Sequence, residues 1–242
     1  GFNTQMFSEV LQRKIKHYMG MYQQLDVEEL ITYDPEKSWN FELGGHFSTN
    51  DTRFTADVAL FWIECFDQQL TVFPEGQTTG RMMTNAGRTR SFGAELSFNA
   101  RLAEGLYLNG AYGYTNARFR ELKDGVNDYA GKYIPYAPQN TASATLSYRL
   151  DIESSWLNSI TISATGRGAG RIYWNERNDI YQPFYATLDG SLRFDGNIWA
   201  VDFWAKNITN THYDLFYFES MGNAFLQRAR GAAVGVRFVL EL

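Results

Sequence analysis

The 242-residue sequence has one cysteine, no long hydrophobic run and no excess of positive charge. Cys65 by itself can form neither an intramolecular disulfide nor a thiolate metal cluster. The longest uninterrupted apolar run, which includes Ala59 to Ile63, is far shorter than the roughly 18 residues that a membrane-spanning helix needs. The net charge of -5 and the scattered basic residues argue against a partner made of nucleic acid. A helical membrane protein and a disulfide-bonded scaffold are therefore excluded.

Residues in the spacing of known catalytic or metal sites are also missing. His17, His46 and His212 lie far apart, so no pair has the spacing of a zinc site. The sequence contains no phosphate-binding glycine loop, no nucleophile elbow and no calcium loop. The glycine-rich stretch Gly166 to Gly170 lies within a strand pattern and does not open a helix. We therefore expect no enzyme activity, no cofactor and no metal.

Strict alternation of apolar and polar residues is the main positive signal. A period of two indicates β-strands, because successive side chains point to opposite faces. Between Arg90 and Phe119 the alternation is very regular, and a short join at Ala103 to Gly105 divides it into two strands. In the first strand the apolar set is Phe92, Ala94, Leu96, Phe98 and Ala100, and the other set is Ser91, Gly93, Glu95, Ser97, Asn99 and Arg101.

The same pattern predicts about nine strands in all. Trp204 is an exception to it, because this aromatic side chain falls on the polar side of its strand. The predicted strands cover residues 38–47, 52–73, 91–102, 106–119, 141–149, 159–168, 186–194, 199–207 and 231–242.

Short and long connections alternate between these strands. The short joins are Asn50-Asp51, Ala103 to Gly105, Asp151 to Ser155 and Asp195 to Asn197. The long ones are Pro74 to Arg90, Glu121 to Asn140, Asn175 to Phe184 and Ser220 to Arg228. Such sorting is typical of antiparallel up-and-down outer-membrane barrels, which have short periplasmic turns and long extracellular loops.

Aromatic residues gather where strands meet the long connections. In a barrel they would form an interfacial girdle, and in a soluble protein they would form the end layers of a core. These residues are Tyr133, Tyr136, Tyr173, Trp174, Tyr181, Phe184, Phe216, Tyr217 and Phe218. The segment Phe7 to Leu25 could form a short helix with Ser8 as its N-cap, either as a ligand wall or as a solvated loop.

The two faces of the strands predict two environments if the protein is a barrel. The apolar face would meet lipid and the polar face would line a wet lumen. The residues predicted to face lipid are Phe92, Leu96, Phe98, Leu106, Leu108, Val234, Val236, Phe238 and Leu240. Those predicted to face the lumen are Glu42, Asp57, Glu95, Asn99, Arg101, Arg149, Asp189, Arg193, Asp202 and Arg237.

Several phrases, in order, resemble the C-terminal part of the β-barrel of TonB-dependent outer-membrane receptors. They are YDPEKSWNFELG at 33–44, ALFWIECFDQQ at 59–69, TNAGRTRSFGAELSF at 84–98, GLYLNGAYGYTNARF at 105–119, YIPYAPQNTASATLSYR at 133–149, LDGSLRF at 188–194 and DFWAKNITNTHY at 202–213. The resemblance implies one all-β domain over residues 1–242, part of a barrel of about 22 strands. It implies that residues 1–37 are a strand end and an extracellular loop.

The resemblance also implies a function and a location. Such receptors lie in the outer membrane of Gram-negative bacteria and import bulky, scarce nutrients, for example ferric siderophores, haem, cobalamin or glycans. Import uses a plug domain and the TonB complex, and the C-terminal strand is the part that the barrel-assembly machinery recognises. The plug and the earlier strands are not in this sequence, so we expect a piece of a longer protein. Leu242 departs from the aromatic residue that often ends the family.

Other functions stay open at this point. A passive porin-like barrel shares the alternation, and a soluble β-rich binding or carbohydrate-active domain would bury its apolar face against a second sheet. The loop-proximal aromatics Tyr173, Trp174, Tyr181 and Tyr217 are candidates for ligand contacts, although they could equally be membrane-interface anchors. The sequence does not identify the nutrient.

Overall fold

The computed structural model describes residues 35–72, 82–124, 127–220 and 223–240. All regular elements within these ranges are strands, and none of the described residues forms a helix long and apolar enough to cross a membrane. The predicted helix at Phe7 to Leu25 lies outside the described residues. The strands are β1 (Lys37–Ser48), β2 (Phe54–Val72), β3 (Met82–Ala103), β4 (Leu106–Asp124), β5 (Asn127–Asp128), β6 (Asn140–Asp151), β7 (Ser159–Ala169), β8 (Ile172–Tyr173), β9 (Tyr181–Gln182), β10 (Tyr185–Asp195), β11 (Trp199–Lys206), β12 (Asp214–Ser220), β13 (Asn223–Arg228) and β14 (Ala233–Leu240).

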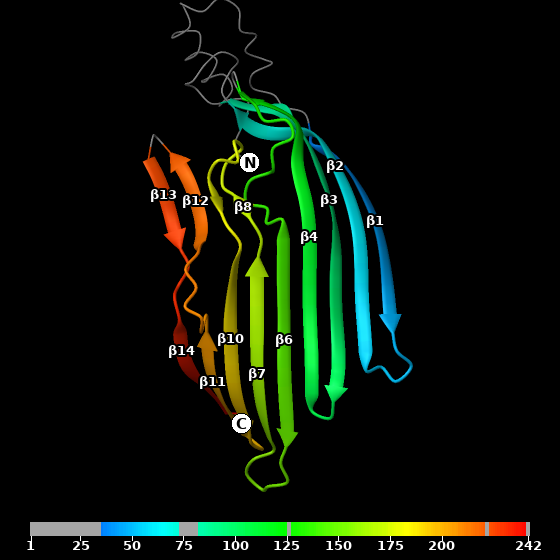
Figure 1. Ribbon diagram of the computed structural model, residues 1–242, viewed down its shortest axis with the longest axis vertical. Helices are drawn as coiled ribbons and strands as arrows, with labels where there is room; N and C mark the ends of the chain where they lie inside the picture. The colour runs from blue at the N-terminus through cyan, green and yellow to red at the C-terminus, as the bar shows by residue number, and fades with distance from the viewer. Residues whose placement is uncertain (1–34, 73–81, 125–126, 221–222, 241–242) are drawn as a thin grey trace, which may run out of the picture. The chain divides into compact units, whose positions relative to one another are not determined.

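Nine of these strands pair in chain order, which confirms the predicted up-and-down arrangement. The order is β1-β2-β3-β4-β6-β7-β10-β11-β14, with β5 paired to β4 at the side (Figure 1). Every pairing from β4 to β14 is antiparallel. The pairs β8–β9 and β12–β13 form two small separate hairpins. Consecutive strands with short joins are therefore neighbours in space.

The chain divides into two compact units. Among the described residues, the first unit contains residues 35–39, 64–89 except 73–81, and 119–131 except 125–126. Phe119 and Leu122 are buried in it, and Arg88 Nε lies 3.6 Å from Glu64 Oε2. The second unit contains residues 40–63, 90–118 and the described residues from 132 onward. It carries the long regular sheet and the candidate site.

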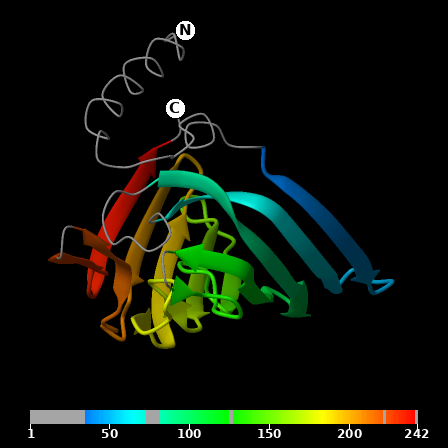
Figure 2. The same cartoon turned by 90° about the horizontal axis from the view of Figure 1, so that it is seen from above.

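In the second unit the strands follow a curved line from β1 to β14, seen from above in Figure 2. Among the described residues, the sheet order leaves these two strands as its edges. The short joins lie at one end of the strands, and the connecting residues 132–139, 170–184, 207–220 and 223–232 lie at the other (Figure 1). This is the sorting of loops that the sequence predicts.

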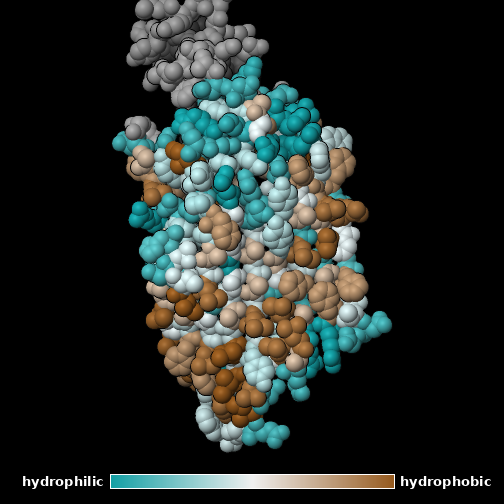
Figure 3. Space-filling model, in the orientation of Figure 1, coloured by the Kyte–Doolittle hydropathy of each residue, from teal (hydrophilic) through white to brown (hydrophobic). Residues whose placement is uncertain are grey.

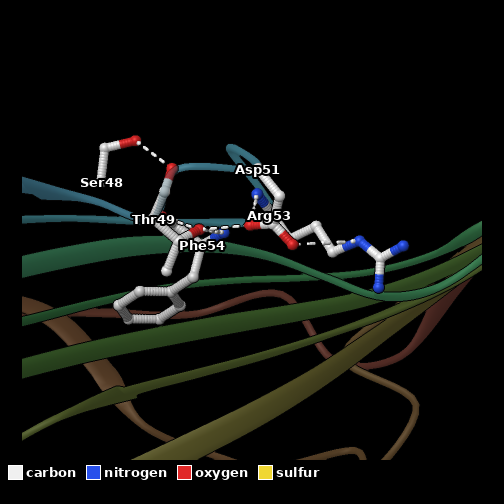
Figure 4. A network of polar contacts seen from close by, with 5 residues as sticks. All are labelled: Ser48, Thr49, Asp51, Arg53 and Phe54. Carbon is white, nitrogen blue, oxygen red and sulfur yellow. Dashed lines mark hydrogen bonds and ion pairs between the residues drawn. The ribbon is translucent and has the colours of Figure 1, made fainter.

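The turn between β1 and β2 shows how a short join is held (Figure 4). Thr49 Oγ1 donates to Asp51 Oδ1 at 2.8 Å and accepts from the backbone N–H of Phe54 at 3.1 Å. Thr52 has a positive φ of 54°, which the tight reversal requires. The prediction placed the turn at Asn50-Asp51 and began the next strand at Thr52. The strand in fact begins at Phe54, so the join covers residues 49–53.

Besides the two-residue strands β5, β8 and β9, longer extended segments were not predicted as strands. β3 begins at Met82 and β4 continues to Asp124, so parts of two predicted loops are strand. The hairpin of β12 and β13 occupies much of the connection 207–232, which is longer than the predicted Ser220 to Arg228. These segments lack clean alternation, since β12 is mostly apolar on both faces and residues 84–90 of β3 are mostly polar on both. Period-two analysis therefore could not find them.

The position of Trp204 on the polar face has a packing explanation. Trp204 is the register partner of Gly235 on the neighbouring strand, and a Cβ at Gly235 would lie 2.2 Å from the Trp204 ring. The ring thus lies over a residue without a side chain. Lys206 Nζ lies 5.7 Å from the centre of the same ring. An aromatic group is accommodated there because the glycine leaves space for it.

Candidate functional site at the loop ends of the strands

The apolar positions of the second unit line up in rows across the strands. One row runs in register through Leu106, Tyr148, Ile162, Leu192, Phe203 and Val236. Figure 3 shows a face on which apolar side chains gather over the lower parts of the strands and hydrophilic ones toward the loop ends. Besides the sheet that carries these rows, the described residues form only the two-stranded sheets β8–β9 and β12–β13.

The residues predicted to face lipid lie on this apolar face. Phe92 is 37% exposed, Leu96 is 39% exposed and Val234 is 81% exposed. Phe98, Leu106 and Leu108 are half-buried between neighbours, whereas Val236, Phe238 and Leu240 are exposed. Phe98 lies over Gly110, where a Cβ would come within 2.4 Å of its ring. The face is therefore closely packed along the sheet and open away from it.

The polar positions form rows of their own. One row runs in register through Arg149, Thr161, Arg193, Asp202 and Arg237. Ion pairs join Arg237 to Asp202 at 3.3 Å, Arg193 to Asp195 at 2.7 Å and Arg149 to Asp151 at 2.7 Å. Asp189 forms an ion pair with Arg167 and accepts from the backbone N–H of Asn207 at 2.8 Å. Most of the charged groups on this part of the polar face are thus paired.

The remaining residues predicted to face the lumen lie on the strands nearer β1. His46 Nδ1 lies 2.6 Å from Asp57 Oδ1, and Asn99 Nδ2 lies 3.5 Å from Thr55 Oγ1. Glu42, Glu95 and Arg101 are exposed. Among the described residues there is no group of three or more His, Cys, Asp or Glu side chains that could hold a metal ion. This side of the sheet is therefore lined by polar and charged side chains.

Aromatic side chains join the long connections at the opposite end from the short turns. Tyr133 stacks on Tyr173 with ring centroids 5.4 Å apart, and Tyr173 meets the edge of Tyr181 at 5.9 Å. Asn178 ties the two connections together, because its side chain accepts from Tyr133 N at 2.7 Å and donates to Tyr133 O at 2.9 Å. Asn178 has a positive φ of 60°, which asparagine tolerates better than most residues. We call Tyr133, Tyr173, Tyr181 and their arginine partners the tyrosine cluster.

A second branch of aromatics extends to the β12–β13 hairpin. Tyr136 stacks on Phe216 at 5.4 Å, tilts against Trp174 at 5.6 Å, and donates its hydroxyl to the carbonyl of Tyr217 at 2.9 Å. Burial raises the pKa of Tyr136, and nearby Glu176 adds to this. A hydrogen bond to Glu219 raises the pKa of Tyr217. Both phenols therefore stay protonated and able to donate at neutral pH.

Two arginines complete the tyrosine cluster. The Arg118 guanidinium lies 3.9 Å from the centre of the Tyr133 ring, and its Nη2 donates to the Tyr133 hydroxyl at 2.5 Å. The Arg171 guanidinium lies 4.7 Å from the centre of the Tyr181 ring, and its Nη1 donates to the Tyr173 hydroxyl at 3.2 Å. Cations over aromatic faces are attracted by the ring quadrupole. The cluster is therefore an electropositive aromatic surface.

The structure separates the four aromatics that were candidates for ligand contacts. Tyr173 and Trp174 are buried, at 9% and 6% exposure, and hold neighbouring connections together. Tyr181 is 46% exposed, and Tyr217 is half-buried. Sequence analysis did not select Arg118 and Arg171, because single arginines near strand ends carry no spacing signal. The contact of Arg171 with Tyr173 and that of Arg118 with Tyr133 are visible only in the folded structure.

Comparison with known proteins finds one family over most of the chain. The profile of the TonB dependent receptor-like β-barrel matches residues 18–208. The pesticin receptor of Yersinia enterocolitica is 27% identical over 205 residues, which cover 83% of this chain and 28% of the receptor. The ferrioxamine B receptor of Salmonella typhimurium is 31% identical over 109 residues, 45% of this chain and 15% of that receptor.

A solved structure has the same fold. The ferric yersiniabactin uptake receptor FyuA from Yersinia pestis matches with a TM-score of 0.70 at 24% identity, over 85% of this chain and 30% of FyuA. The chain thus spans less than a third of the length of these relatives. The family match selects the receptor barrel over the porin-like barrel and the soluble β-rich domain. The chain belongs to the TonB dependent receptor-like β-barrel family, whose members lie in the outer membrane of Gram-negative bacteria.

Proposed function

We propose that this chain is the C-terminal part of the barrel of a receptor that takes up an iron–siderophore complex with energy from the TonB complex. The family match over residues 18–208 carries the proposal. The related proteins are named as receptors for pesticin, ferrioxamine B and ferric yersiniabactin, and two of these names refer to iron chelates. Uptake of haem, cobalamin or a glycan is a weaker alternative, because none of these three names refers to such a nutrient.

The two faces of the sheet have separate roles in this proposal. The apolar rows, including Phe92, Leu96 and Val234, meet lipid, and the polar rows, including Asp189, Arg193 and Asp202, line the lumen. Strong exposure of the apolar rows supports this, because a soluble protein rarely leaves so large a contiguous apolar surface open. Paired charges on the polar face support it as well, because they tolerate partial exclusion from bulk water better than single charges.

Two partners follow from the receptor role. TonB would act through a plug domain encoded elsewhere in the complete protein, and not through residues of the sheet described above. The barrel-assembly machinery would recognise β14, whose apolar residues Val234, Val236 and Phe238 alternate with Gly235 and Arg237. The role assigned to this chain is binding and passage, with no catalytic step.

A growth experiment with the complete gene tests the proposal. A strain that lacks the gene should lose growth on at least one ferric chelate under iron limitation, and the complete gene should restore it. Disruption of TonB should abolish the restored growth, since a passive channel would not need energy. Unchanged uptake in the absence of TonB would refute the receptor role and favour a passive barrel. Growth restored on haem, cobalamin or a glycan alone would refute the siderophore part.

A further inference from the structure

Arginines on the polar face of β6, β7, β10 and β14 share one feature. Each has a carboxylate partner within ion-pair distance, either on its own strand or on the next. The pairs are Arg149 with Asp151, Arg167 with Asp189, Arg193 with Asp195, and Arg237 with Asp202. The side chain of Arg171, two residues after the end of β7, has only tyrosine partners among the described residues. Within the ranges that the structure describes, no acidic side chain forms an ion pair with it.

The register of the sheet places Arg171 at the loop end of β6 and β7. Thr141 of β6 pairs with Ala169, the last residue of β7, and Arg171 lies two residues beyond it. Gly170 N donates to the carbonyl of Asn140 at 2.7 Å and Gln139 N donates to the carbonyl of Arg171 at 3.3 Å, so the backbone of Arg171 stays beside the segment that precedes β6. Under the proposed function the sheet lines the lumen, so Arg171 lies at its outer mouth, where a nutrient arrives.

The tyrosines hold the Arg171 side chain in a defined position. The Tyr173 hydroxyl accepts from its Nη1, and the Tyr181 ring lies 4.7 Å from the guanidinium carbon. Tyr173 is itself buried and stacked on Tyr133. Tyr173 is therefore a support, whereas Arg171 and Tyr181 are exposed. The result is an accessible guanidinium beside an accessible aromatic ring.

Such a pair suits a ligand that brings both negative charge and flat rings. A guanidinium forms strong charge-assisted hydrogen bonds to anionic oxygens, and an exposed tyrosine ring stacks on another aromatic ring. We infer that Arg171 and Tyr181 select an anionic ferric chelate with aromatic oxygen donors, a catecholate or phenolate, over an uncharged ferric hydroxamate. This inference rests on the proposed function and adds the substrate class.

Binding to the purified full-length receptor tests the inference. The two probes are a ferric tris-catecholate, which has a net negative charge, and a neutral ferric trihydroxamate without rings. Arg171→Gln should weaken binding of the tris-catecholate roughly ten-fold or more, the usual loss for one charge-assisted hydrogen bond. Arg177→Gln is the matched control, because Arg177 lies in the same connection but is paired with Asp179 at 3.0 Å. The Arg177→Gln variant should bind the tris-catecholate with the affinity of the wild type.

Further measurements keep the inference open to refutation if Arg171→Gln fails to fold. Arg171→Lys keeps the charge and should lose less affinity than Arg171→Gln, and wild-type affinity for the tris-catecholate should fall with added salt. Equal affinities of Arg171→Gln and Arg177→Gln, or a wild-type preference for the trihydroxamate, would overturn the inference. If the receptor supports growth on the trihydroxamate and not on the tris-catecholate, the proposed uptake function stands and only the inferred substrate class is wrong.

Discussion

Two adjacent rows of the second unit differ completely in chemistry although they lie one residue apart on the same strands. The row through Leu106, Tyr148, Ile162 and Val236 contains no charged residue. The neighbouring row contains Arg149, Arg193, Asp202 and Arg237, largely in ion pairs. A single strand thus specifies two environments, and the register aligns them across the sheet. A shift of one residue in any pairing would exchange the two.

The exposure of its charged side chains shows that the polar row is in contact with water. Arg237 keeps 61% of its side-chain surface exposed while Asp202 keeps 15%. Ion pairs of this kind contribute little in water and become important only where water is excluded. The apolar row should not tolerate a charged side chain, because lipid hydrocarbon offers no partner for a charge. The two rows should therefore respond very differently to the same substitution.

A charge placed in the apolar row should have the largest effect. Leu146→Arg, in the middle of β6, should destabilise the folded full-length receptor by about 2–4 kcal/mol, the cost of an arginine at the centre of a lipid-facing strand. The control is Ser147→Arg, one residue along β6, which lies between Tyr107 and Ser163 on the polar face. Urea unfolding in lipid vesicles measures both. Equal losses for the two variants would show that Leu146 does not face lipid.

A methyl group added at a packed point of the polar face should have the next largest effect. A Cβ at Gly93 would lie 2.0 Å from the backbone oxygen of Tyr114 and 2.6 Å from the Phe61 ring. Because the backbone oxygen has little freedom to move, Gly93→Ala should cost about 1–3 kcal/mol. Gly45→Ala is the control, since a Cβ there meets no atom within 4 Å. The same unfolding assay applies, and a neutral Gly93→Ala would mean that β3 and β4 adjust easily.

The regular strands could be predicted from the sequence because each meets two environments along its length. The strand at 141–149 was predicted within two residues of its observed ends, since Leu146 and Tyr148 alternate with Ser147 and Arg149. The start of β3 was not predicted, because residues Met82 to Arg90 are mostly polar on both faces. Alternation encodes a difference between two sides, and it disappears where a strand has the same surroundings on both.

Only the general location of the candidate site could be predicted. Aromatic residues near the long connections predicted the end of the strands at which the tyrosine cluster lies, but exposure divides them, with Trp174 buried and Tyr181 exposed. Arg171 gave no signal at all, because its interest depends on its contacts with Tyr173 and Tyr181 and on the absence of an acid nearby in the described residues. Contacts between connections far apart in sequence are set by tertiary packing and not by local pattern.

Loss of one ion pair in the polar row should have only a small effect if that row is wet. Asp202→Asn removes the charge that lies between Arg193 and Arg237 in register, and it should cost about 1 kcal/mol or less. Arg237→Gln and the double variant complete a cycle that isolates the pair from other effects. The thermal midpoint of the full-length receptor provides the measurement. A loss of several kcal/mol would indicate a dry environment and would weaken the contrast between the two rows.

The smallest expected effect on stability lies at the short turns, where the two rows end and charged side chains are exposed to bulk water. The Thr49 hydroxyl, followed by the backbone N–H of Arg53, lowers the pKa of Asp51. A carboxyl with a lowered pKa stabilises the folded state above its unfolded pKa, and this contribution is lost as the pH falls through the lowered value. Thr49→Val should therefore reduce the thermal midpoint more at about pH 7 than at a pH below the lowered pKa of Asp51, where the carboxyl is protonated in both states. Ser48→Ala removes a neighbouring hydroxyl that bonds only to the carbonyl of Thr49, so its effect should not change with pH. If the two variants show the same pH dependence, the Thr49–Asp51 bond does not contribute to the turn, and the join is held by its backbone hydrogen bonds alone.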